Sequence, residues 1–294
     1  MYEEGRYLTP EPQTPNPETV PVQSVLELQE TARLLRKHII LSTTAAGSGH
    51  PSSSFSCTEI LCALYFGGIL RYDPTNPTWP DRDRFILSKG HACPAQYAAM
   101  AVAGYFPEEE LLTLRKLGSR LEGHPNLQRL PGIEASTGSL GQGLSLGLGM
   151  ALAARLDGAD WKTWVVLGDG ELDEGQVWEA ALAAAKYGVS NLIAIVDANT
   201  AQQTGYTKDV LDTEPKADKW RSFGWETHEV DGHDLEALLS VLKCAGSAEH
   251  RPQAIIARTL KGKGVSFVER EYGYHGKPLT EEETRRALEE LGWK

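Results

Sequence analysis

Apolar and polar positions follow two different periods along this chain. Between residue 25 and Gly47, apolar side chains recur every three or four residues, which predicts an amphipathic helix that the glycine ends. The repeating positions are Leu26, Ala32, Leu35 and Ile39. Short runs rich in β-branched and other apolar residues predict strands at 84–88, 163–167, 191–197, 225–230 and 253–259.

Helical stretches separate these strands, at 177–188 and 234–246, and a capped helix is expected in the tail from Thr280. The alternation predicts an α/β fold with a doubly wound, mostly parallel sheet and helices on both faces. Residues 1–24 are rich in Pro, Thr and Glu and lack an apolar period. We therefore expect a flexible arm at 1–24 and one domain at 25–294.

Composition and charge exclude several classes of partner. The 294 residues carry a net charge of −11, which disfavours binding to nucleic acid or an anionic membrane surface. The weakly polar run at 143–156 is too short to span a bilayer, and no basic-then-apolar leader begins the chain. The four cysteines form no CxxC pair, so buried, reduced thiols are expected. These features predict a soluble, cytoplasmic protein.

Two polar turns follow successive predicted strands. Asp169 and Gly170 come after the strand at 163–167, and Asn199 comes after the strand at 191–197. The carboxyl ends of parallel strands meet at one edge, where open α/β sheets bind ligands. The Asp169 carboxylate, the Asn199 amide oxygen and a backbone carbonyl near Ala201 form an all-oxygen set suited to Mg²⁺ or Ca²⁺, with phosphate and water completing the shell.

Gly170 is expected to let a backbone N–H approach a phosphate, with the positive end of a following helix beside it. Either turn alone is equally well explained by the conformational preferences of Gly, Asp and Asn. Together, at this spacing, they resemble the thiamine-diphosphate signature, and the chain from about Val25 onward resembles the N-terminal half of a transketolase. The blocks that carry the resemblance lie at 45–51, 83–92, 122–125, 136–143, 217–234, 259–269 and 275–279.

The resemblance implies a role for several loop residues. It places His91 and His275 on the cofactor diphosphate, and His50 and His124 in the substrate channel, where they bond to sugar hydroxyls or move protons. His50, His124 and His275 are thus the implied catalytic histidines. The other implied cofactor-binding residues are Gly138, Leu140, Asp169, Gly170, Glu174 and Asn199. Glu174 and Glu179 match acidic positions that couple paired sites in this family.

The family implies a reaction in which thiamine diphosphate carries a two-carbon ketol unit from a ketose phosphate to an aldose phosphate. The family's cofactor-activating glutamate lies on a separate pyrimidine-binding domain, for which no long segment remains after Leu279. We therefore expect a second chain with the pyrimidine-binding and C-terminal domains, and an α2β2 heterotetramer.

The residues by themselves also allow other functions. The chain is also compatible with an α-type subunit of a 2-oxo acid dehydrogenase or carbon-sugar synthase, or with a non-catalytic relative. Glycines at 141–147 resemble a dinucleotide loop but are better explained by close helix packing. The lysines at 261–264 are expected to be solvated, although one could meet an acidic sugar phosphate. The chain departs from the family pattern at Ser52, Lys89, Ser139 and the stretch 200–205.

Overall fold

Five parallel strands form a single sheet in this computed structural model, which describes residues 21–293. The strands are β1 (Arg84–Leu87), β2 (Thr163–Gly168), β3 (Leu192–Ala198), β4 (Glu226–Asp231) and β5 (Gln253–Arg258). Their spatial order is β1-β2-β3-β5-β4, and every neighbouring pair is parallel. All five predicted strands are confirmed, with ends that differ by one residue, and their carboxyl ends meet at one edge of the sheet.

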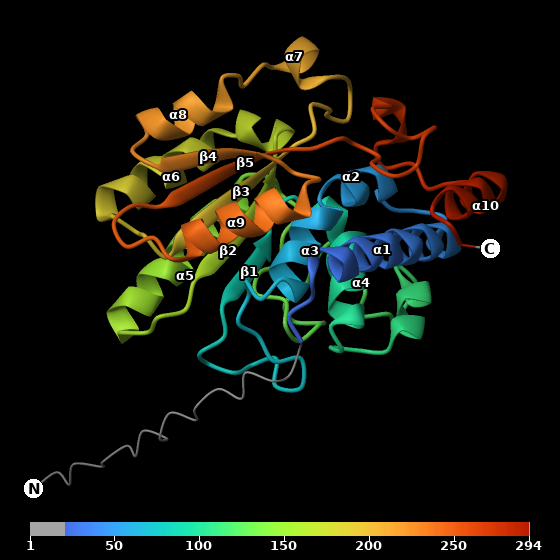
Figure 1. Cartoon of the computed structure of the whole chain (residues 1–294), viewed down its shortest axis with the longest axis horizontal. Helices are drawn as coiled ribbons and strands as arrows, with labels where there is room; N and C mark the ends of the chain where they lie inside the picture. Colours follow the sequence, from blue (N-terminus) through green and yellow to red (C-terminus); the bar gives the residue numbers. More distant parts are fainter. Residues whose placement is uncertain (1–20, 294) are drawn as a thin grey trace, which may run out of the picture.

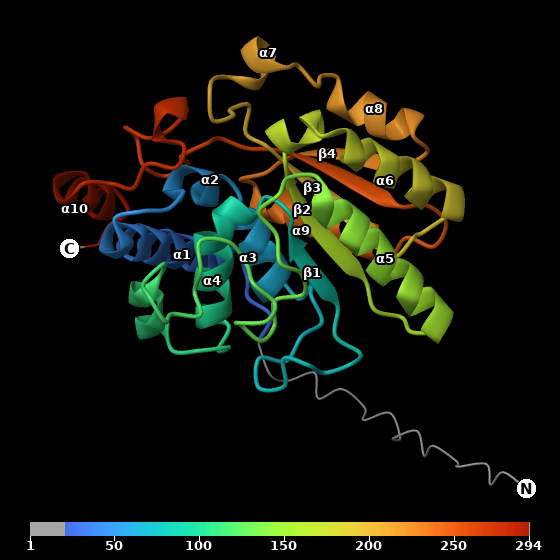
Figure 2. The ribbon, with the colours of Figure 1, turned by 180° about the vertical axis from the view of Figure 1, so that it is seen from behind.

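Helices cover both faces of the sheet (Figures 1 and 2). One face packs against α1 (Val25–Ala46), α3 (Thr58–Phe66), α4 (Cys93–Val102) and α9 (Leu235–Gly246). The other packs against α5 (Gln142–Asp157), α6 (Gly175–Tyr187) and α8 (Lys216–Ser222). The remaining elements are the helices α2 (Pro51–Ser56), α7 (Thr207–Val210) and α10 (Glu281–Glu290), and the 3-10 turns η1 (Gly90–Ala92), η2 (Glu108–Thr113), η3 (Gly170–Asp173) and η4 (Tyr272–Tyr274).

The central strand β3 shows why this sheet needs two helical layers. Ile193 and Ile195 enter the core beneath α3 and α9, whereas Ala194 and Val196 enter the core beneath α5 and α6. Every residue of β3 is buried. A strand that is buried on both faces usually consists of apolar residues throughout. Asp197 is the one charged residue in β3, and a buried charge is costly unless it has a partner.

The long helix α1 confirms the predicted ends and corrects one predicted core position. Ser24 and Glu27 form a capping box, and Gly47 closes the helix in the left-handed region, at φ 58°. Leu28, Leu35 and Ile39 are fully buried, but Leu26 is 74% exposed. Two residues along a helix turn the side chain by about 200°, so Leu26 and Leu28 point to opposite faces.

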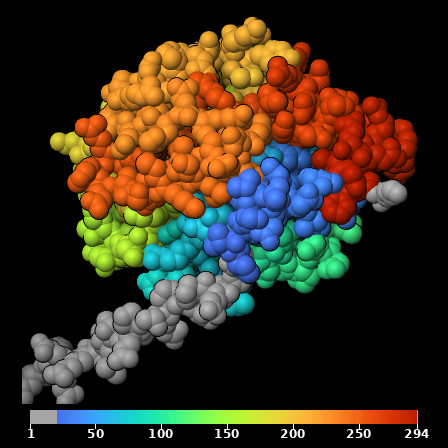
Figure 3. Space-filling view, in the orientation of Figure 1, coloured from blue at the N-terminus to red at the C-terminus, as the bar shows by residue number. Residues whose placement is uncertain are grey.

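The two ends of the domain pack together. Figure 3 shows α1, in blue, beside the orange and red C-terminal segments on one face of the molecule. The Thr44 and Thr284 hydroxyls are 2.8 Å apart, and Arg33 Nη2 donates to the Leu291 carbonyl at 2.7 Å. Residues 1–20 of the expected arm lie outside the described residues. The boundary at residue 24 stays a prediction, although the Gln23 amide already donates to the Phe66 carbonyl at 2.9 Å.

Two further expectations concern membranes and thiols. Among residues 21–293, no helix is both long enough and apolar enough to cross a bilayer. Cys57, Cys62 and Cys93 are buried free thiols, as expected, but Cys244 is exposed. The prediction of a buried thiol was wrong for Cys244 because it lies in the last turn of α9, away from the face that packs on the sheet.

Candidate functional site

A cavity of 490 Å³ lies beyond the carboxyl ends of β2 and β3. All eleven residues that the sequence assigned to the cofactor, the metal and the channel line it: His50, His91, His124, Gly138, Leu140, Asp169, Gly170, Glu174, Asn199, Ala201 and His275. Glu179 is not among the lining residues, and both Glu174 and Glu179 are exposed. The structure therefore brings the predicted set together from seven separate segments of the chain.

Asp169 and Asn199 lie at the ends of neighbouring strands, as predicted. Asp169 Oδ1 accepts the Gly170 N–H at 2.9 Å, and Oδ2 accepts the Thr200 N–H at 2.5 Å, which ties the two turns together. Burial, followed by the nearby Asp197 carboxylate, raises the pKa of Asp169 to about 6. Asn199 Oδ1 accepts the Ala201 N–H at 3.2 Å. A cation placed beside a buried carboxylate such as Asp169 would stabilise its ionised form.

The helix expected directly after Gly170 begins later than predicted. Residues 170–173 form the turn η3, and α6 starts at Gly175 with Glu174 as its cap residue. A Cβ added to Gly170 would lie 2.8 Å from Gln202 Cγ, so the backbone here passes close to the 200–205 loop. The expectation that the Gly170 N–H approaches a phosphate stays a prediction, whereas a helix starting at the turn itself was wrong.

Three imidazoles form a triangle in the cavity. The ring centroids of His50, His91 and His275 are 5.1–5.3 Å apart. Burial lowers the pKa of His50 to about 4 and that of His275 to about 3, and places the pKa of His91 well below its usual value, with neighbouring positive charges adding to each shift. These rings are therefore neutral at pH 7. His50 Nδ1 is buried without a hydrogen-bond partner in the described chain.

Two buried lysines in the cavity were missed as functional groups. Lys261, expected to be solvated, is 1% exposed, and its Nζ lies 3.0 Å from both Ser53 Oγ and His275 Nδ1. Burial, followed by the charge of Lys89, lowers the pKa of Lys261 to about 8. Lys89 is also 1% exposed and pairs with Asp197. Spacing gives no clue that either lysine turns inward, because that depends on which loops meet at the sheet edge.

Glu171 is a second buried carboxylate that the sequence reasoning passed over. Its Oε1 accepts the Gly141 N–H at 2.9 Å and the Ser88 hydroxyl, and its Oε2 accepts the Gly168 N–H at 3.0 Å. These bonds tie the loop that carries Gly138 and Leu140 to the end of β2. The available signal in the sequence was the position of Glu171 directly after Gly168, Asp169 and Gly170.

Glycines let the loops approach one another. Gly141 has φ 83°, and a Cβ there would lie 2.8 Å from Glu174 Cβ. In α5, an added Cβ at Gly143 would lie 2.3 Å from Ser88 Oγ, and one at Gly147 would lie 2.6 Å from Val165 Cγ2. The glycines at 141–147 thus serve close packing of a helix on the sheet, as predicted.

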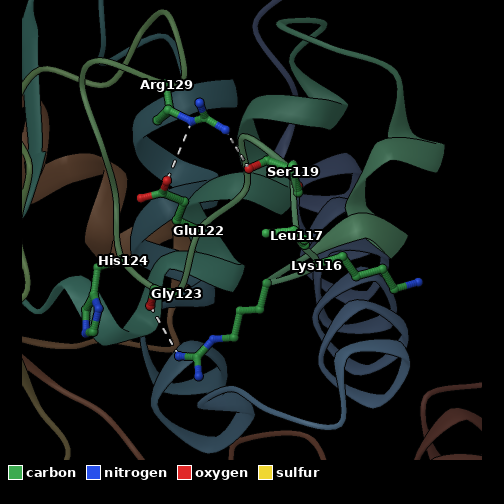
Figure 4. Close-up of a pocket in the computed structure, with 9 residues that line it drawn as sticks. Lys116, Leu117, Ser119, Glu122, Gly123, His124 and Arg129 are labelled. Carbon is green, nitrogen blue, oxygen red and sulfur yellow. Dashed lines mark hydrogen bonds and ion pairs between the residues drawn. The ribbon is translucent and has the colours of Figure 1, made fainter.

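Figure 4 shows a second hollow, of 590 Å³. His124 lines both this hollow and the first. Arg129 Nε lies 3.6 Å from Glu122 Oε1, and Arg115 Nη2 donates to the Gly123 carbonyl at 3.3 Å. After burial, the charge of Arg115 is the next cause that lowers the pKa of both His50 and His124. Arg115 therefore favours the neutral form of both imidazoles.

Comparisons with known proteins agree with this geometry. Residues 27–294 match the family described as transketolase, thiamine diphosphate binding domain. The chain is 45% identical over 266 residues to a 6-deoxy-6-sulfo-D-fructose transketolase subunit of Clostridium sp. (strain MSTE9), and 42% identical over 266 residues to an apulose-4-phosphate transketolase subunit of Actinobacillus succinogenes. Both matches cover 90% of this chain and 96% of the relative.

Longer relatives match over part of their length. The transketolase of Homo sapiens is 43% identical over 270 residues, which are 92% of this chain and 42% of the human protein. A crystal structure of the transketolase of Campylobacter jejuni superposes with a TM-score of 0.86 at 33% identity, over 92% of this chain and 44% of that one. The parallel sheet, the cavity at its carboxyl edge and these matches together establish that the chain belongs to the transketolase family, as its thiamine diphosphate binding domain.

Proposed function

We propose that this chain is the N-terminal subunit of a two-chain transketolase, which moves a two-carbon ketol unit from a ketose phosphate to an aldose phosphate. The observation that carries the proposal is a buried ammonium, Lys261, that faces the cavity with a hydroxyl and an imidazole as its hydrogen-bond partners in the described chain. A buried cation without a carboxylate partner is costly, and an anionic ligand would offset that cost.

The residues present fit the diphosphate end of thiamine diphosphate. Lys261, His91 and His275 offer one positive charge and two neutral imidazoles, and Gly170 lines the cavity without a side chain of its own. His50 Nδ1, buried without a partner in the described chain, supplies another polar atom that a ligand can satisfy. Gly138 and Leu140 would contact the aminopyrimidine end. Bound thiamine diphosphate supplies the electron sink that such a carbon–carbon cleavage requires.

Asp169, Asn199 and the Ala201 carbonyl would hold Mg²⁺ or Ca²⁺ together with cofactor phosphate and water. The described part of the chain contains no group of three or more His, Cys, Asp or Glu side chains that could bind a metal by themselves. The proposed set has one carboxylate and relies on amide, carbonyl and phosphate oxygens for the rest, which suits a hard cation.

The channel histidines would act on the sugar. His50 and His124 are neutral because burial lowers their pKa, so each ring has one nitrogen that accepts a proton and one that donates. A neutral imidazole can bond to a donor-sugar hydroxyl and take its proton when the adjacent carbon–carbon bond breaks. His275 would serve both the diphosphate and this proton movement.

The proposal includes a partner. The alignment covers 96% of the length of two transketolase subunits but only 42% of the length of the human transketolase, which fits an enzyme divided between two chains. The partner would carry the pyrimidine-binding and C-terminal domains, and the assembly would be a cytoplasmic α2β2 heterotetramer acting in pentose phosphate metabolism. Glu174 and Glu179, both exposed, would lie near the contact between like subunits.

Two measurements test the proposal. Calorimetry with thiamine diphosphate and Mg²⁺ should detect binding, and a chain that binds no cofactor in the presence of its partner would be the non-catalytic relative instead. A ketol-transfer assay with xylulose 5-phosphate and ribose 5-phosphate should show turnover by the two-chain enzyme. Turnover of 2-oxo acids, with no ketol transfer between sugars, would assign the chain to another class of thiamine enzyme.

A further inference from the structure

The charged residue inside β3 is part of a buried polar network beneath the candidate metal site. Asp197 is 0% exposed, and its carboxylate accepts hydrogen bonds from Lys89 Nζ, from Ser56 Oγ at 2.6 Å and from Thr259 Oγ1 at 2.5 Å. Lys89 Nζ also donates to the Ser53 carbonyl at 3.0 Å. Replacing a buried ion pair with apolar side chains of similar volume is often neutral or stabilising, so stability is not a sufficient explanation for the pair.

The network reaches Asn199 through its amide group. Asn199 Nδ2 donates to Asp197 Oδ2 at 3.1 Å, while Asn199 Oδ1 accepts the Ala201 N–H at 3.2 Å. An ionised carboxylate only accepts hydrogen bonds, so the –NH₂ group must face Asp197 and the amide oxygen must face the other way. That other side is the edge of the cavity, where Asn199 is expected to present an oxygen to a cation.

Lys89 reaches Asp197 from a separate loop at this edge of the sheet. Asp169 directly follows β2, and Asp197 lies near the end of the neighbouring strand β3, opposite Gly168. The Lys89 side chain starts close to the end of β2, because its Cβ would lie 3.8 Å from a Cβ added at Gly168, next to Asp169. Lys89 comes from the loop after β1, so the contact to Asp197 spans the end of β2.

We propose that Lys89 and Asp197 are positioning residues for the metal-binding turn: their ion pair holds the Asp197 carboxylate where it accepts the Asn199 amide N–H, which fixes that amide with its oxygen toward the cation. This inference rests on the proposed function, because it assumes that Asp169 and Asn199 hold the metal of thiamine diphosphate. Residues that orient metal ligands affect metal affinity without touching the metal.

The test compares three variants of the full-length chain, with the partner chain present in all samples. Lys89→Met leaves Asp197 buried and unpaired and should lower the melting temperature strongly. Asp197→Asn, and the double variant Lys89→Met/Asp197→Asn, remove the carboxylate that dictates the orientation of the Asn199 amide. The double variant should regain much of the melting temperature lost by Lys89→Met, because it contains no unpaired buried charge.

The decisive measurement is the Mg²⁺ concentration that half-saturates thiamine diphosphate binding, followed by calorimetry. We expect the folded double variant to need about tenfold to a hundredfold more Mg²⁺ than the wild type, despite its recovered stability. The matched control is Asp83→Asn, at the opposite edge of the sheet, where a buried aspartate accepts the Lys162 N–H at 2.8 Å; it should leave the Mg²⁺ requirement unchanged.

A double variant with the wild-type Mg²⁺ requirement would overturn the inference and leave the proposed function standing. Failure of the wild-type chain to bind thiamine diphosphate with Mg²⁺ would instead overturn the proposed function.

Discussion

Asp169 is the residue on which the proposed metal site depends most. Asp169→Ala removes the one carboxylate of the set and should abolish Mg²⁺-dependent retention of thiamine diphosphate, because the cation loses its only charged protein ligand. Gel filtration followed by measurement of bound cofactor checks this outcome. Asp234→Ala is the control, since Asp234 caps α9 by accepting the Glu236 and Ala237 N–H groups at 3.0 and 3.1 Å.

The control should cost about 1 kcal/mol of stability and leave cofactor retention intact. Unchanged affinity for thiamine diphosphate in Asp169→Ala would refute the assignment of this turn to the metal.

Lys261 predicts a pH dependence of cofactor binding. Burial lowers its pKa to about 8 in the free chain, and a bound diphosphate favours the charged ammonium. Affinity that depends on this charge should be constant below pH 8 and should weaken as the pH rises above 8, by up to tenfold per pH unit. Dissociation constants of thiamine diphosphate measured from pH 7 to 9.5 would show it.

Lys261→Met keeps the length of the side chain without the charge. It should bind thiamine diphosphate more weakly at pH 7, and its affinity should no longer fall between pH 8 and 9.5. A variant that keeps the wild-type pH profile would mean that another group titrates.

The same shift affects the stability of the free chain in the opposite sense. The folded chain releases the Lys261 proton near pH 8, whereas the unfolded chain keeps it until about pH 10.5, so the unfolded state binds more protons between these values. Stability due to this group therefore rises with pH in that window, while cofactor affinity falls. A lysine that binds the diphosphate should show both trends, a rise in stability and a fall in cofactor affinity with pH. A lysine that only packs in the interior should show the rise in stability alone.

At the scale of an element, α5 offers a matched pair of glycines. Gly143→Ala would put a Cβ 2.3 Å from Ser88 Oγ and 2.9 Å from Ser88 Cα, so the helix must shift away from β1. We expect a loss of about 1–3 kcal/mol of stability. Gly149, in the same helix, has nothing within 4 Å of an added Cβ, and Gly149→Ala should stabilise by about 0.5–1 kcal/mol.

Urea unfolding of both variants measures the difference. Ser88 donates to Glu171, which holds the loop of Gly138 and Leu140, so Gly143→Ala should also weaken cofactor binding. Equal stability of the two alanine variants would contradict the close packing of α5 on the end of β1.

At the scale of the whole molecule, activity is expected to require assembly. The cofactor would be held at its diphosphate end by this chain and at its pyrimidine end by the partner, so association of the two chains and cofactor binding should stabilise each other. The isolated chain should show no ketol transfer from xylulose 5-phosphate to ribose 5-phosphate. Adding the partner should restore turnover together with a solution mass equal to two copies of each chain.

Mass measurement by light scattering, with and without thiamine diphosphate and Mg²⁺, checks the coupling, because the cofactor should lower the concentration at which the complex forms. Substantial turnover by the isolated chain would refute the divided enzyme, since the acid that activates the cofactor would then lie within these 294 residues.

The pattern of residues along the chain was sufficient to predict features that depend on neighbouring residues, namely strands, helices and turns. The spacing and runs of apolar residues predicted all five strands and α1. They could do so because the faces of a strand or helix that are buried determine which positions are apolar. The two turns at Asp169 and Asn199 could be placed at one edge because parallel strands share their carboxyl ends. The family resemblance then brought His50, His91, His124 and His275 to the same site, and the structure places all of them in one cavity.

Other features depended on contacts between distant segments, which no spacing rule reaches. Whether Lys261 is solvated or buried depends on Ser53 and His275, which lie 208 and 14 residues away along the chain. Asp197 reads as a strand end in the sequence, yet Lys89 from the other side of β2 makes it an ion-pair partner. The sequence alone therefore determined the five strands, the long helix α1 and the two polar turns at the edge of the sheet. Only the tertiary structure decided which charges lie buried together, because that depends on which loops meet at the edge of the sheet.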